Sequence, residues 1–343
     1  MAAISDFRSD TVTRPSARMR EAIATAEVAD DVLDGDPTVG RLEALAAERL
    51  GKAGALFVPS GTMANQLAIG VWTRPGDELV AEGEAHIVRW EGGAVGHLHG
   101  VQTLTLAGSR GALSADQITA SMRPDSPHCP RSGLVCLEQT HMGEGGRALP
   151  LEELEAPAAA ARAAGVPVHL DGARLFHAVV ALGIPAQRFA EVADSVSICL
   201  SKGLGAPVGS LVAGDEAFVA AARRLRKRMG GWMRQSGLLA AAGLLALEEN
   251  VERLAEDHAL AKALAEGLNA LPGLECPPES VDTNIVRVAV THPERTAAGL
   301  SEAFGDRGVS VLSLGPDHLR FVTHLDVGPA DVERVLQAAA DLL

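Results

Sequence analysis

The chain has 343 residues, of which 47% are hydrophobic, and carries a net charge of −14. This length suffices for one large domain and a smaller one, and the acidic balance argues against nucleic acid as a partner. The four cysteines form no Cys-x-x-Cys pair, and no apolar run is long enough for a membrane span, so we expect a soluble cytoplasmic protein.

The first forty residues form a polar arm with little periodicity. Within it, Pro15 precedes a predicted helix over Ser16–Ala26, because proline is tolerated where a helix starts. An acidic, turn-forming stretch follows over Asp30–Pro37, and Thr38 is the predicted N-cap of a helix that ends near Leu50. An arm of this kind covers a site or a neighbouring subunit, and the alternative is a surface tail.

A short apolar strand, Ala55–Pro59, leads into a predicted helix over Ser60–Trp72. Ser60, Gly61 and Thr62 stand at the start of that helix, where free backbone N–H groups and the helix dipole favour an anion. The stretch fits a phosphate cradle, although an ordinary N-cap is the commoner explanation for such residues. It is not a Walker A loop, so an ordinary nucleotide site is disfavoured.

Short apolar strands then alternate with helices. The predicted strands are Glu78–Ala81, Gln102–Leu106, Gly133–Glu138, Pro167–Asp171, Val196–Leu200 and Ser210–Ala213. This alternation predicts an α/β fold with a mostly parallel sheet that helices cover on both faces. Ligands bind at the carboxyl ends of such strands, and Asp171, His86 and Lys202 all fall at or just past predicted strand ends.

Lys202 lies between a buried strand and a glycine-rich turn, within the stretch from Val196 to Ser210. A lysine amine held away from water is a good nucleophile for an aldehyde, and the small residues after it let a flat group approach the backbone. The stretch therefore fits a lysine that forms a Schiff base with an aldehyde cofactor. A lysine that only caps a strand end fits the same residues.

The pattern changes near residue 250. A very apolar helix over Leu238–Glu248 and a helix over residues 251–270 precede a strand at Thr283–Val290 and another at Leu319–Leu325. We expect a large domain over residues 1–250, which includes the arm, and a small C-terminal α/β domain over residues 251–343.

Three features together predict pyridoxal 5'-phosphate as the cofactor. Lys202 supplies an amine for its aldehyde, Asp171 a carboxylate for its ring nitrogen, and Ser60–Thr62 an anchor for its phosphate. Asp171 precedes Lys202 by 31 residues (202 − 171), with one predicted helix and one strand between them, so both reach one pocket. The chain has no tyrosine to stack on the ring, which leaves His86, with Trp90 as the second candidate.

The motifs resemble those of fold-type I pyridoxal-phosphate enzymes, and specifically the low-specificity L-threonine aldolases of the β-eliminating lyase/threonine aldolase family. The stretches that carry the resemblance follow the same order along nearly the whole chain: Phe7–Pro15, Asp30–Thr38, Ser60–Asn65, Ala85–His86, His169–Phe176, Ser197–Ser210, Met233–Gly237 and Arg320–Leu325. The resemblance implies an aldehyde-lyase that reversibly cleaves L-threonine, L-allo-threonine and other L-β-hydroxy-α-amino acids to glycine and an aldehyde such as acetaldehyde.

The resemblance also implies roles for individual residues. Lys202 would hold the cofactor as a Schiff base, and Asp171 would pair with the ring nitrogen. The remaining cofactor contacts would come from Ser60, Gly61, Thr62, His86, Arg174 and Arg234, and the substrate would be bound by Ser9, Arg174, Arg320, His86 and His128. The arginines suit a carboxylate, and His86 or His128, directly or through water, would take the β-hydroxyl proton. No metal is implied.

Other reactions on the same scaffold, β-elimination or transamination, remain alternatives, and a non-catalytic binding protein is a remote one. The chain departs from the family at Leu33, where a tyrosine is usual, and at Trp232, where the residue is usually small. These departures leave open which β-hydroxy amino acids the aldehyde pocket accepts. The resemblance further implies a homotetramer, a dimer of dimers with active sites at the subunit interface, and no membrane partner.

Overall fold

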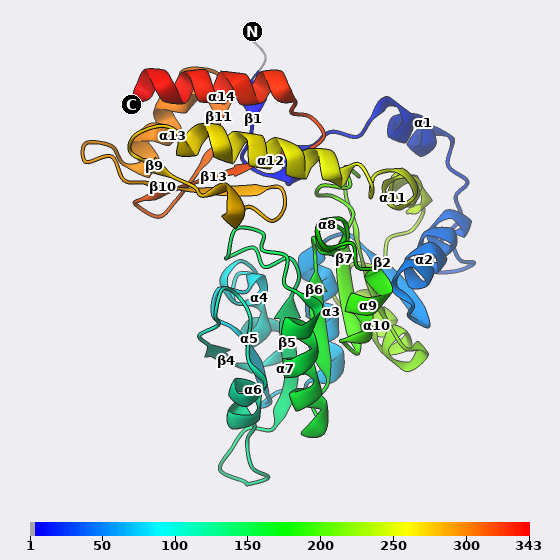
Figure 1. Cartoon of the computed structure of the whole chain (residues 1–343). Coiled ribbons are helices and arrows are strands. Elements are labelled where there is room, and N and C mark those ends of the chain that lie inside the picture. Colours follow the sequence, from blue (N-terminus) through cyan, green and yellow to red (C-terminus); the bar gives the residue numbers. More distant parts are fainter. Residues whose placement is uncertain (1–3) are drawn as a thin grey trace.

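The computed structural model describes residues 4–343, which form a large domain with a small domain above it in the view of Figure 1. A seven-stranded sheet with the order β2-β8-β7-β6-β5-β3-β4 lies at the centre of the large domain. Its strands are β2 (Gly54–Val58), β3 (Glu78–Glu82), β4 (Gln102–Leu106), β5 (Ser132–Glu138), β6 (Val168–Gly172), β7 (Ser195–Cys199) and β8 (Ser210–Gly214).

Only β8 runs against the other strands of this sheet, since it pairs antiparallel with β2 and with β7. The predicted mostly parallel α/β fold is therefore confirmed. Strands β5, β6 and β7 are buried along their whole length, because helices cover both faces and leave these apolar strands no contact with water. All the parallel strands end at the same edge of the sheet.

The helices of the large domain pack on the two faces of the sheet. One hydrophobic cluster includes residues of α1, α2, α6, α7, α8, α9 and α11, and separate clusters on the other face include residues of α3, α5 and α10. Their bounds are α1 (Ala17–Thr25), α2 (Pro37–Leu50), α3 (Gly61–Trp72), α4 (His86–Arg89), α5 (Ala94–His99), α6 (Ala115–Ser121), α7 (Leu151–Ala163), α8 (Leu175–Leu182), α9 (Ala186–Glu191), α10 (Glu216–Arg228) and α11 (Gly237–Glu249).

Two local predictions are wrong. Asp36, not Thr38, caps α2, because its carboxylate accepts the amide hydrogens of Thr38 and Val39 at 3.0 and 3.1 Å. The Thr38 hydroxyl donates instead to Glu27 O. Two helices, α8 and α9, separate β6 from β7 where one helix was expected, since Gly183 ends α8 in a left-handed conformation that breaks the apolar run.

The small domain is a four-stranded antiparallel sheet with the order β12-β13-β10-β9. Its elements are α12 (Leu254–Asn269), β9 (Leu274–Glu275), η2 (Pro278–Ser280), β10 (Ile285–Val290), α13 (Ala297–Gly305), β11 (Val309–Ser310), β12 (Leu312–Leu314), β13 (His318–Val322) and α14 (Pro329–Leu342). In Figure 1, α12 and α14 lie side by side along the top of this domain. No helix over residues 4–343 is long and apolar enough to cross a membrane.

The start of the arm belongs structurally to the small domain. Strand β1 (Ser5–Asp6) pairs in parallel with β11, and Phe7 is fully buried in the core of the small domain. The arm then crosses to the large domain through η1 (Asp10–Val12). The expected division at residue 250 placed the whole arm with the large domain. It did not take into account that Phe7, an apolar residue in a polar segment, is stabilised by burial in a hydrophobic core, here that of the small domain.

Candidate active site

The carboxyl ends of the parallel strands bring several predicted site residues together. Glu138 at the end of β5 stands opposite Asp171 of β6, and Asp171 stands opposite Ser197 of β7. Lys202 lies in the turn after β7, and His86 opens α4 after β3. One edge of the sheet thus collects acid, amine and imidazole groups, as the strand pattern predicted.

Asp171 is 2% exposed and ionised. Burial alone would raise the pKa of this carboxyl, but the charges of His86 and Lys202 outweigh burial, so the pKa is lowered. One carboxylate oxygen accepts a hydrogen bond from Asn65 Nδ2 at 2.7 Å, and the other accepts the Ala173 amide hydrogen at 3.0 Å. The carboxylate is therefore fixed in place and charged, as an acceptor for a protonated ring nitrogen must be.

Asn65, from the first turns of α3, links the polar groups beneath this edge. Burial lowers the pKa of His169 to about 4, so the ring is neutral, and its Nε2 lies 3.1 Å from Asn65 Oδ1. Ser197 Oγ also donates to Asn65 Oδ1, at 2.7 Å. The amide nitrogen of Asn65 is thereby left to donate one hydrogen to Asp171 and the other to Glu91, at 2.7 and 2.8 Å.

His86 Nδ1 lies 3.0 Å from Oε1 of Glu91, a residue that the sequence interpretation did not single out. The side chain of Glu91 is fully buried, although the sequence shows only a polar residue after a short helix. Trp90, the second ring-stacking candidate, is 59% exposed. The ligand atoms of His86, Glu91 and Asp171 lie within 4.8 Å of one another, but the Asn65 amide hydrogens point at both carboxylates and would oppose a cation there.

Glu138 fastens two loops of the site to each other. Its carboxylate accepts the backbone hydrogen of His86 at 2.6 Å and that of Met142 at 2.8 Å. Burial, as the largest effect, raises the pKa of Glu138, and the charge of Asp171 adds to that rise. The loop after β3 and the loop after β5 are therefore held in one arrangement beneath the site.

Lys202 is half-buried, and its charge acts on three acidic or basic groups of the site. Those groups are Asp10, His86 and Asp171. The charge of the amine thus acts on the carboxylate of Asp171.

The start of α3 fits an anion. Ser60 is the N-cap, its hydroxyl oxygen accepts the Met63 amide hydrogen at 3.2 Å, and the amides of Gly61 and Thr62 stay available for a ligand. A Cβ at Gly61 would stand 2.6 Å from Cys199 Sγ. Glycine at this position lets the helix start press against the end of β7, beside the turn that carries Lys202.

Arg234 forms an ion pair with Asp30 within one chain. Its Nη1 lies 3.2 Å from both carboxylate oxygens of Asp30, and its side chain is 54% exposed. The backbone nearby does pass α3, because a Cβ at Gly231 would collide with Met63 Sδ. Trp232 donates to Asp31 at 2.6 Å and lies over the guanidinium of Arg226. Its indole therefore anchors the acidic turn.

Arg174 and Asp10 form a buried bidentate pair at 2.7 and 2.8 Å. Burial alone would raise the pKa of Asp10, but the charge and hydrogen bonds of Arg174 hold that pKa far below its usual value. Nε and Nη2 of Arg174 are thus occupied, which leaves Nη1 for a ligand. Ser9 caps η1 by accepting the Thr11 amide hydrogen, and its hydroxyl lies next to Asp10.

Arg320 reaches the site from β13. Its Nη2 donates to Arg8 O at 3.0 Å, and its Nη1 lies 3.9 Å from Met142 Sδ. Its Nε is buried and has no partner within the part of the chain that the structure describes. Burial, and then the charge of Arg174, lower the pKa of Arg320. Two guanidinium groups with an unfilled donor form a site for a carboxylate.

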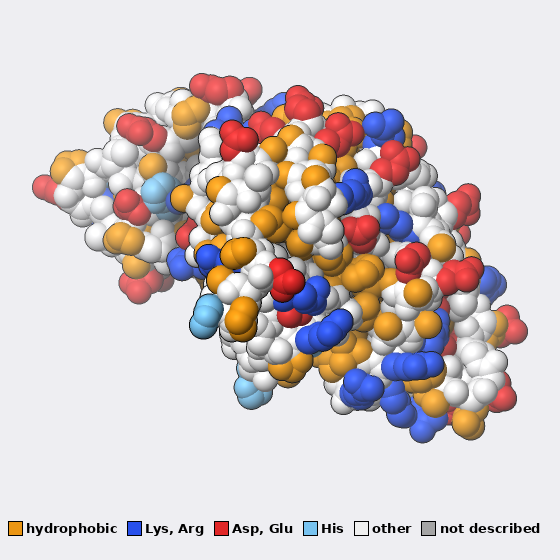
Figure 2. Space-filling model, turned by 90° about the horizontal axis from the view of Figure 1, so that it is seen from below, with side chains coloured by type: hydrophobic (Ala, Val, Ile, Leu, Met, Phe, Trp, Pro, Cys, Tyr) orange, Lys and Arg blue, Asp and Glu red, His pale blue; other side chains and the backbone are white. Residues whose placement is uncertain are grey.

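His128 does not join these residues within one chain. Its loop precedes β5, so it lies at the amino end of that strand, about 20 Å away by the strand's rise per residue. Figure 1 shows this loop at the far end from the small domain, and His128 is exposed. Figure 2 views that end of the molecule, where side chains of both charges are interspersed with hydrophobic ones. Within one chain, His128 therefore lies at the opposite edge of the sheet from Asp171 and Lys202.

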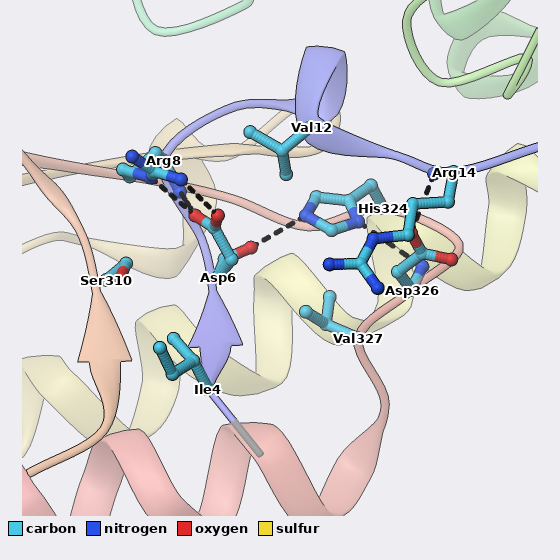
Figure 3. Close-up of a pocket in the computed structure, with 9 residues that line it drawn as sticks. All are labelled: Ile4, Asp6, Arg8, Val12, Arg14, Ser310, His324, Asp326 and Val327. Atoms are coloured by element: carbon cyan, nitrogen blue, oxygen red, sulfur yellow. Dashed lines mark hydrogen bonds and ion pairs between the residues drawn. The ribbon is translucent and has the colours of Figure 1, made fainter. Parts of the chain in front are cut away.

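A cavity of about 820 Å³ lies elsewhere, between the arm and the small domain (Figure 3). Several of its polar groups contact one another: Arg8 forms an ion pair with Asp6 at 2.6 Å, and His324 Nε2 lies 2.7 Å from the backbone oxygen of Asp6. None of the predicted site residues lines it. Chemistry, and not volume, therefore identifies the candidate site.

Comparison with known proteins shows the family of the chain. The model of the family described as beta-eliminating lyase matches residues 6–291. The chain is 46% identical to a probable low-specificity L-threonine aldolase of Arabidopsis thaliana, over 96% of this chain and 95% of that protein. It is 43% identical to the low specificity L-threonine aldolase of Escherichia coli K12, over 96% of each. The structure of a putative L-allo-threonine aldolase of Listeria monocytogenes superposes with a TM-score of 0.80 at 26% identity, over 95% of this chain and 92% of that one.

Proposed function

The chain belongs to the beta-eliminating lyase family, and on that premise we propose how its residues cleave L-threonine and L-allo-threonine to glycine and acetaldehyde. The protein is an aldehyde-lyase, the cleavage is reversible, and pyridoxal phosphate is its cofactor. The names of the relatives include the words low specificity, and we extend the substrates to other L-β-hydroxy-α-amino acids.

One observation carries the assignment of roles. A charged, buried Asp171 lies beside Lys202 at the edge of the sheet, and Arg320 Nε is buried without a partner among residues 4–343. The first pair suits a cofactor with an aldehyde and a ring nitrogen. The unfilled guanidinium donor suits the carboxylate of an amino acid. A substrate and a cofactor that meet there account for both features.

The residues present fit the cofactor. Lys202 Nζ would hold its aldehyde carbon, Asp171 its ring nitrogen, and the amides after Ser60 its phosphate, with His86 against the ring. When bound, pyridoxal phosphate supplies an electron-withdrawing ring that stabilises negative charge on the substrate Cα. Arg234 would bind the phosphate only after its ion pair with Asp30 breaks.

The substrate carboxylate would be bound by Arg320, by the free Nη1 of Arg174 and by Ser9. A carboxylate held at two guanidinium groups would fix the rotation about the substrate Cα–N bond, and this rotation decides which bond at Cα is aligned for cleavage. His86 would accept the proton of the β-hydroxyl as the Cα–Cβ bond breaks. The same imidazole returns a proton when glycine is released.

A second copy of the chain is part of the proposal. His128 can act on a substrate only from a neighbouring chain, because its loop lies at the other edge of its own sheet. We therefore propose a homotetramer, built as a dimer of dimers with sites at the interface, in the cytoplasm. Exposed Leu33, Trp90 and Leu98 supply apolar surface for such contacts.

The direct experiment incubates the purified protein, loaded with pyridoxal phosphate, with L-threonine and with L-allo-threonine, and measures acetaldehyde and glycine. We expect each substrate to yield acetaldehyde and glycine, with one molecule of acetaldehyde for each molecule of glycine. The Lys202→Ala variant is the matched control for non-enzymatic cleavage. Absence of acetaldehyde from both substrates would refute the proposal.

A further inference from the structure

Glu91 is a buried carboxylate with three hydrogen-bond donors around it. Oε1 accepts a hydrogen from Asn65 Nδ2 at 2.8 Å and lies 3.0 Å from His86 Nδ1, and Oε2 accepts from Gln66 Nε2 at 2.7 Å. Its side chain is fully buried. Burying a carboxylate costs free energy unless hydrogen-bond donors replace the lost water, so this arrangement requires that all three neighbours donate.

That demand fixes the position of the proton on His86. An ionised carboxylate only accepts hydrogen bonds, and the hydrogens of Asn65 and Gln66 already point at Glu91. His86 Nδ1 must therefore carry a hydrogen and donate it to Glu91. In the neutral ring, the lone pair is then on Nε2. The other ring nitrogen is thus the one that can receive a proton from a substrate.

The opposite orientation of the Asn65 amide is excluded by its other partners. Flipping the amide would place Oδ1 against the carboxylates of Glu91 and Asp171, and Nδ2 against Ser197 Oγ and the neutral His169. Two acceptor–acceptor contacts would then lie in the buried network. The tautomer of His86 is therefore set by a chain of hydrogen bonds that starts in the strands of the sheet.

We propose that Glu91 is a positioning residue for His86: it holds the ring as the Nδ1–H tautomer, so that Nε2 accepts the β-hydroxyl proton during cleavage. This inference rests on the proposed function of His86. Glu91 touches neither substrate nor cofactor in the proposal, and acts through His86. It also shares Asn65 with Asp171, so one amide orients both the imidazole and the acid for the ring nitrogen.

The charges around His86 act in the same sense. Burial opposes the imidazolium, but the hydrogen bond to Glu91 and the charge of Asp171 outweigh burial, and the pKa of His86 is raised. Lys202 works against this rise. Glu138 of β5 accepts the backbone hydrogen of His86. Burial raises the pKa of Glu138, which favours the protonated, neutral form of this side chain. A more basic Nε2 accepts a proton more readily.

The experiment compares Glu91→Gln with Glu84→Gln in the holoenzyme. Glu84 is seven residues before Glu91 along the chain, is 53% exposed and pairs only with Arg89. For Glu91→Gln we expect kcat to fall by roughly 10- to 100-fold, less than the 10²- to 10⁴-fold that a general base supplies. KM and the cofactor absorption spectrum should stay near their original values. Glu84→Gln should leave kcat, KM and the spectrum unchanged.

The pH profile separates positioning from a structural effect. Activity rises as His86 loses its proton, and removal of the Glu91 charge lowers the pKa of His86. The acidic limb of kcat/KM should therefore move to lower pH in Glu91→Gln. In a His86→Asn background, Glu91→Gln should cause no further loss of kcat. An equal loss with and without His86 would overturn the proposal, as would an acidic limb that does not move.

A measurement on protein labelled with ¹⁵N-histidine keeps this test independent of the aldolase activity. The His86 signals are assigned by their loss in His86→Asn. We expect the wild-type ring to show the hydrogen on Nδ1, and Glu91→Ala to shift the population toward Nε2–H. An Nε2–H ring in the wild type would refute the proposal even if threonine is cleaved. An Nδ1–H ring without acetaldehyde production would instead refute the proposed function and leave the role of Glu91 in place.

Discussion

The two walls of the candidate site are built differently. On the sheet wall, Asp171, Asn65 and Glu91 form a closed network of short hydrogen bonds within one domain. On the opposite wall, Arg174 and Arg320 come from different domains, and Arg320 retains a buried donor without a partner. Both walls are charged and buried, yet only the first has its central groups satisfied before a ligand arrives.

The difference separates a permanent site from a transient one. A network that is complete in the empty protein holds its groups in one geometry, which suits a cofactor that stays. An unfilled guanidinium donor has a buried cost that a carboxylate removes on binding, which suits a substrate that comes and goes. The following substitutions probe each wall in turn, and they run from the largest expected effect to the smallest.

Lys202→Ala tests the sheet wall most severely. Loss of the amine should lower the rate of acetaldehyde release by on the order of 10⁴-fold or more, the size of effect seen when a covalent nucleophile is removed. Borohydride reduction of the wild type, followed by peptide mass analysis, should trap the cofactor on the peptide that contains Lys202. A pyridoxyl mass on a different peptide would contradict this assignment.

Asp10→Asn tests how the opposite wall is held. Breaking a buried ion pair leaves the charge of Arg174 uncompensated, so we expect the free energy of unfolding to fall by about 3–5 kcal/mol. Because the folded pKa of Asp10 lies below its unfolded value of about 3.9, this stabilisation is present above that pH and is lost as the pH falls below it.

Denaturant unfolding at pH 7 and at pH 3 checks both statements about Asp10. The wild type should lose stability between these values, and Asp10→Asn should lose less. The same large pH dependence in both proteins would show that other carboxylates are responsible.

Arg320→Ala tests the unfilled donor. We expect KM for threonine to rise by about 30- to 1000-fold, which corresponds to the 2–4 kcal/mol typical of a truncated charged contact. The cofactor spectrum should be unchanged. Arg287→Ala is the matched control. Arg287 of β10 stands opposite Arg320 of β13 in the strand register, but its side chain is exposed. Equal losses of cofactor and substrate binding in Arg320→Ala would remove the distinction between the two walls.

Trp232→Phe should have the smallest effect. It removes the hydrogen bond to Asp31, which is worth about 1 kcal/mol of unfolding free energy. Because the indole anchors the acidic turn, kcat and the ratio of L-threonine to L-allo-threonine cleavage should not change. A shifted ratio in a kinetic assay would place Trp232 in the aldehyde pocket.

The sequence predicted the sheet wall better than the opposite one. Apolar strands alternating with helices imply parallel pairing, and parallel pairing alone carries Asp171 and Lys202 to one edge. No sequence pattern indicates that Glu91 is buried, because its burial depends on contacts with Asn65 and Gln66 of α3. The sheet geometry does constrain His128, and the interpretation missed that a residue before a strand lies at the opposite edge from a residue after it.

The opposite wall depends on contacts between segments far apart in the chain. Asp10 and Arg174 are separated by 164 positions, and Arg8 and Arg320 by 312. No local periodicity announces such pairs, so the sequence supplied the arginines as carboxylate binders but not the acid that orients one of them. Phe7 was overlooked for the same reason, since its core forms from residues beyond 260.

The arm also acts as a short mechanical linkage. Phe7 is fastened to the small domain by hydrogen bonds to Ser310 and Val322, and Asp10 to the large domain through Arg174. Three peptide units join them, with a maximum reach of about 11 Å, and Ser9 between them is already extended at φ −168° and ψ 152°. The chain has little slack, and Asp10 also lies 3.4 Å from Asn284 Nδ2 of the small domain, so a rotation of the small domain would be transmitted to Asp10 and Arg174. A rotation of the small domain would therefore move the two residues that we propose to orient the substrate carboxylate.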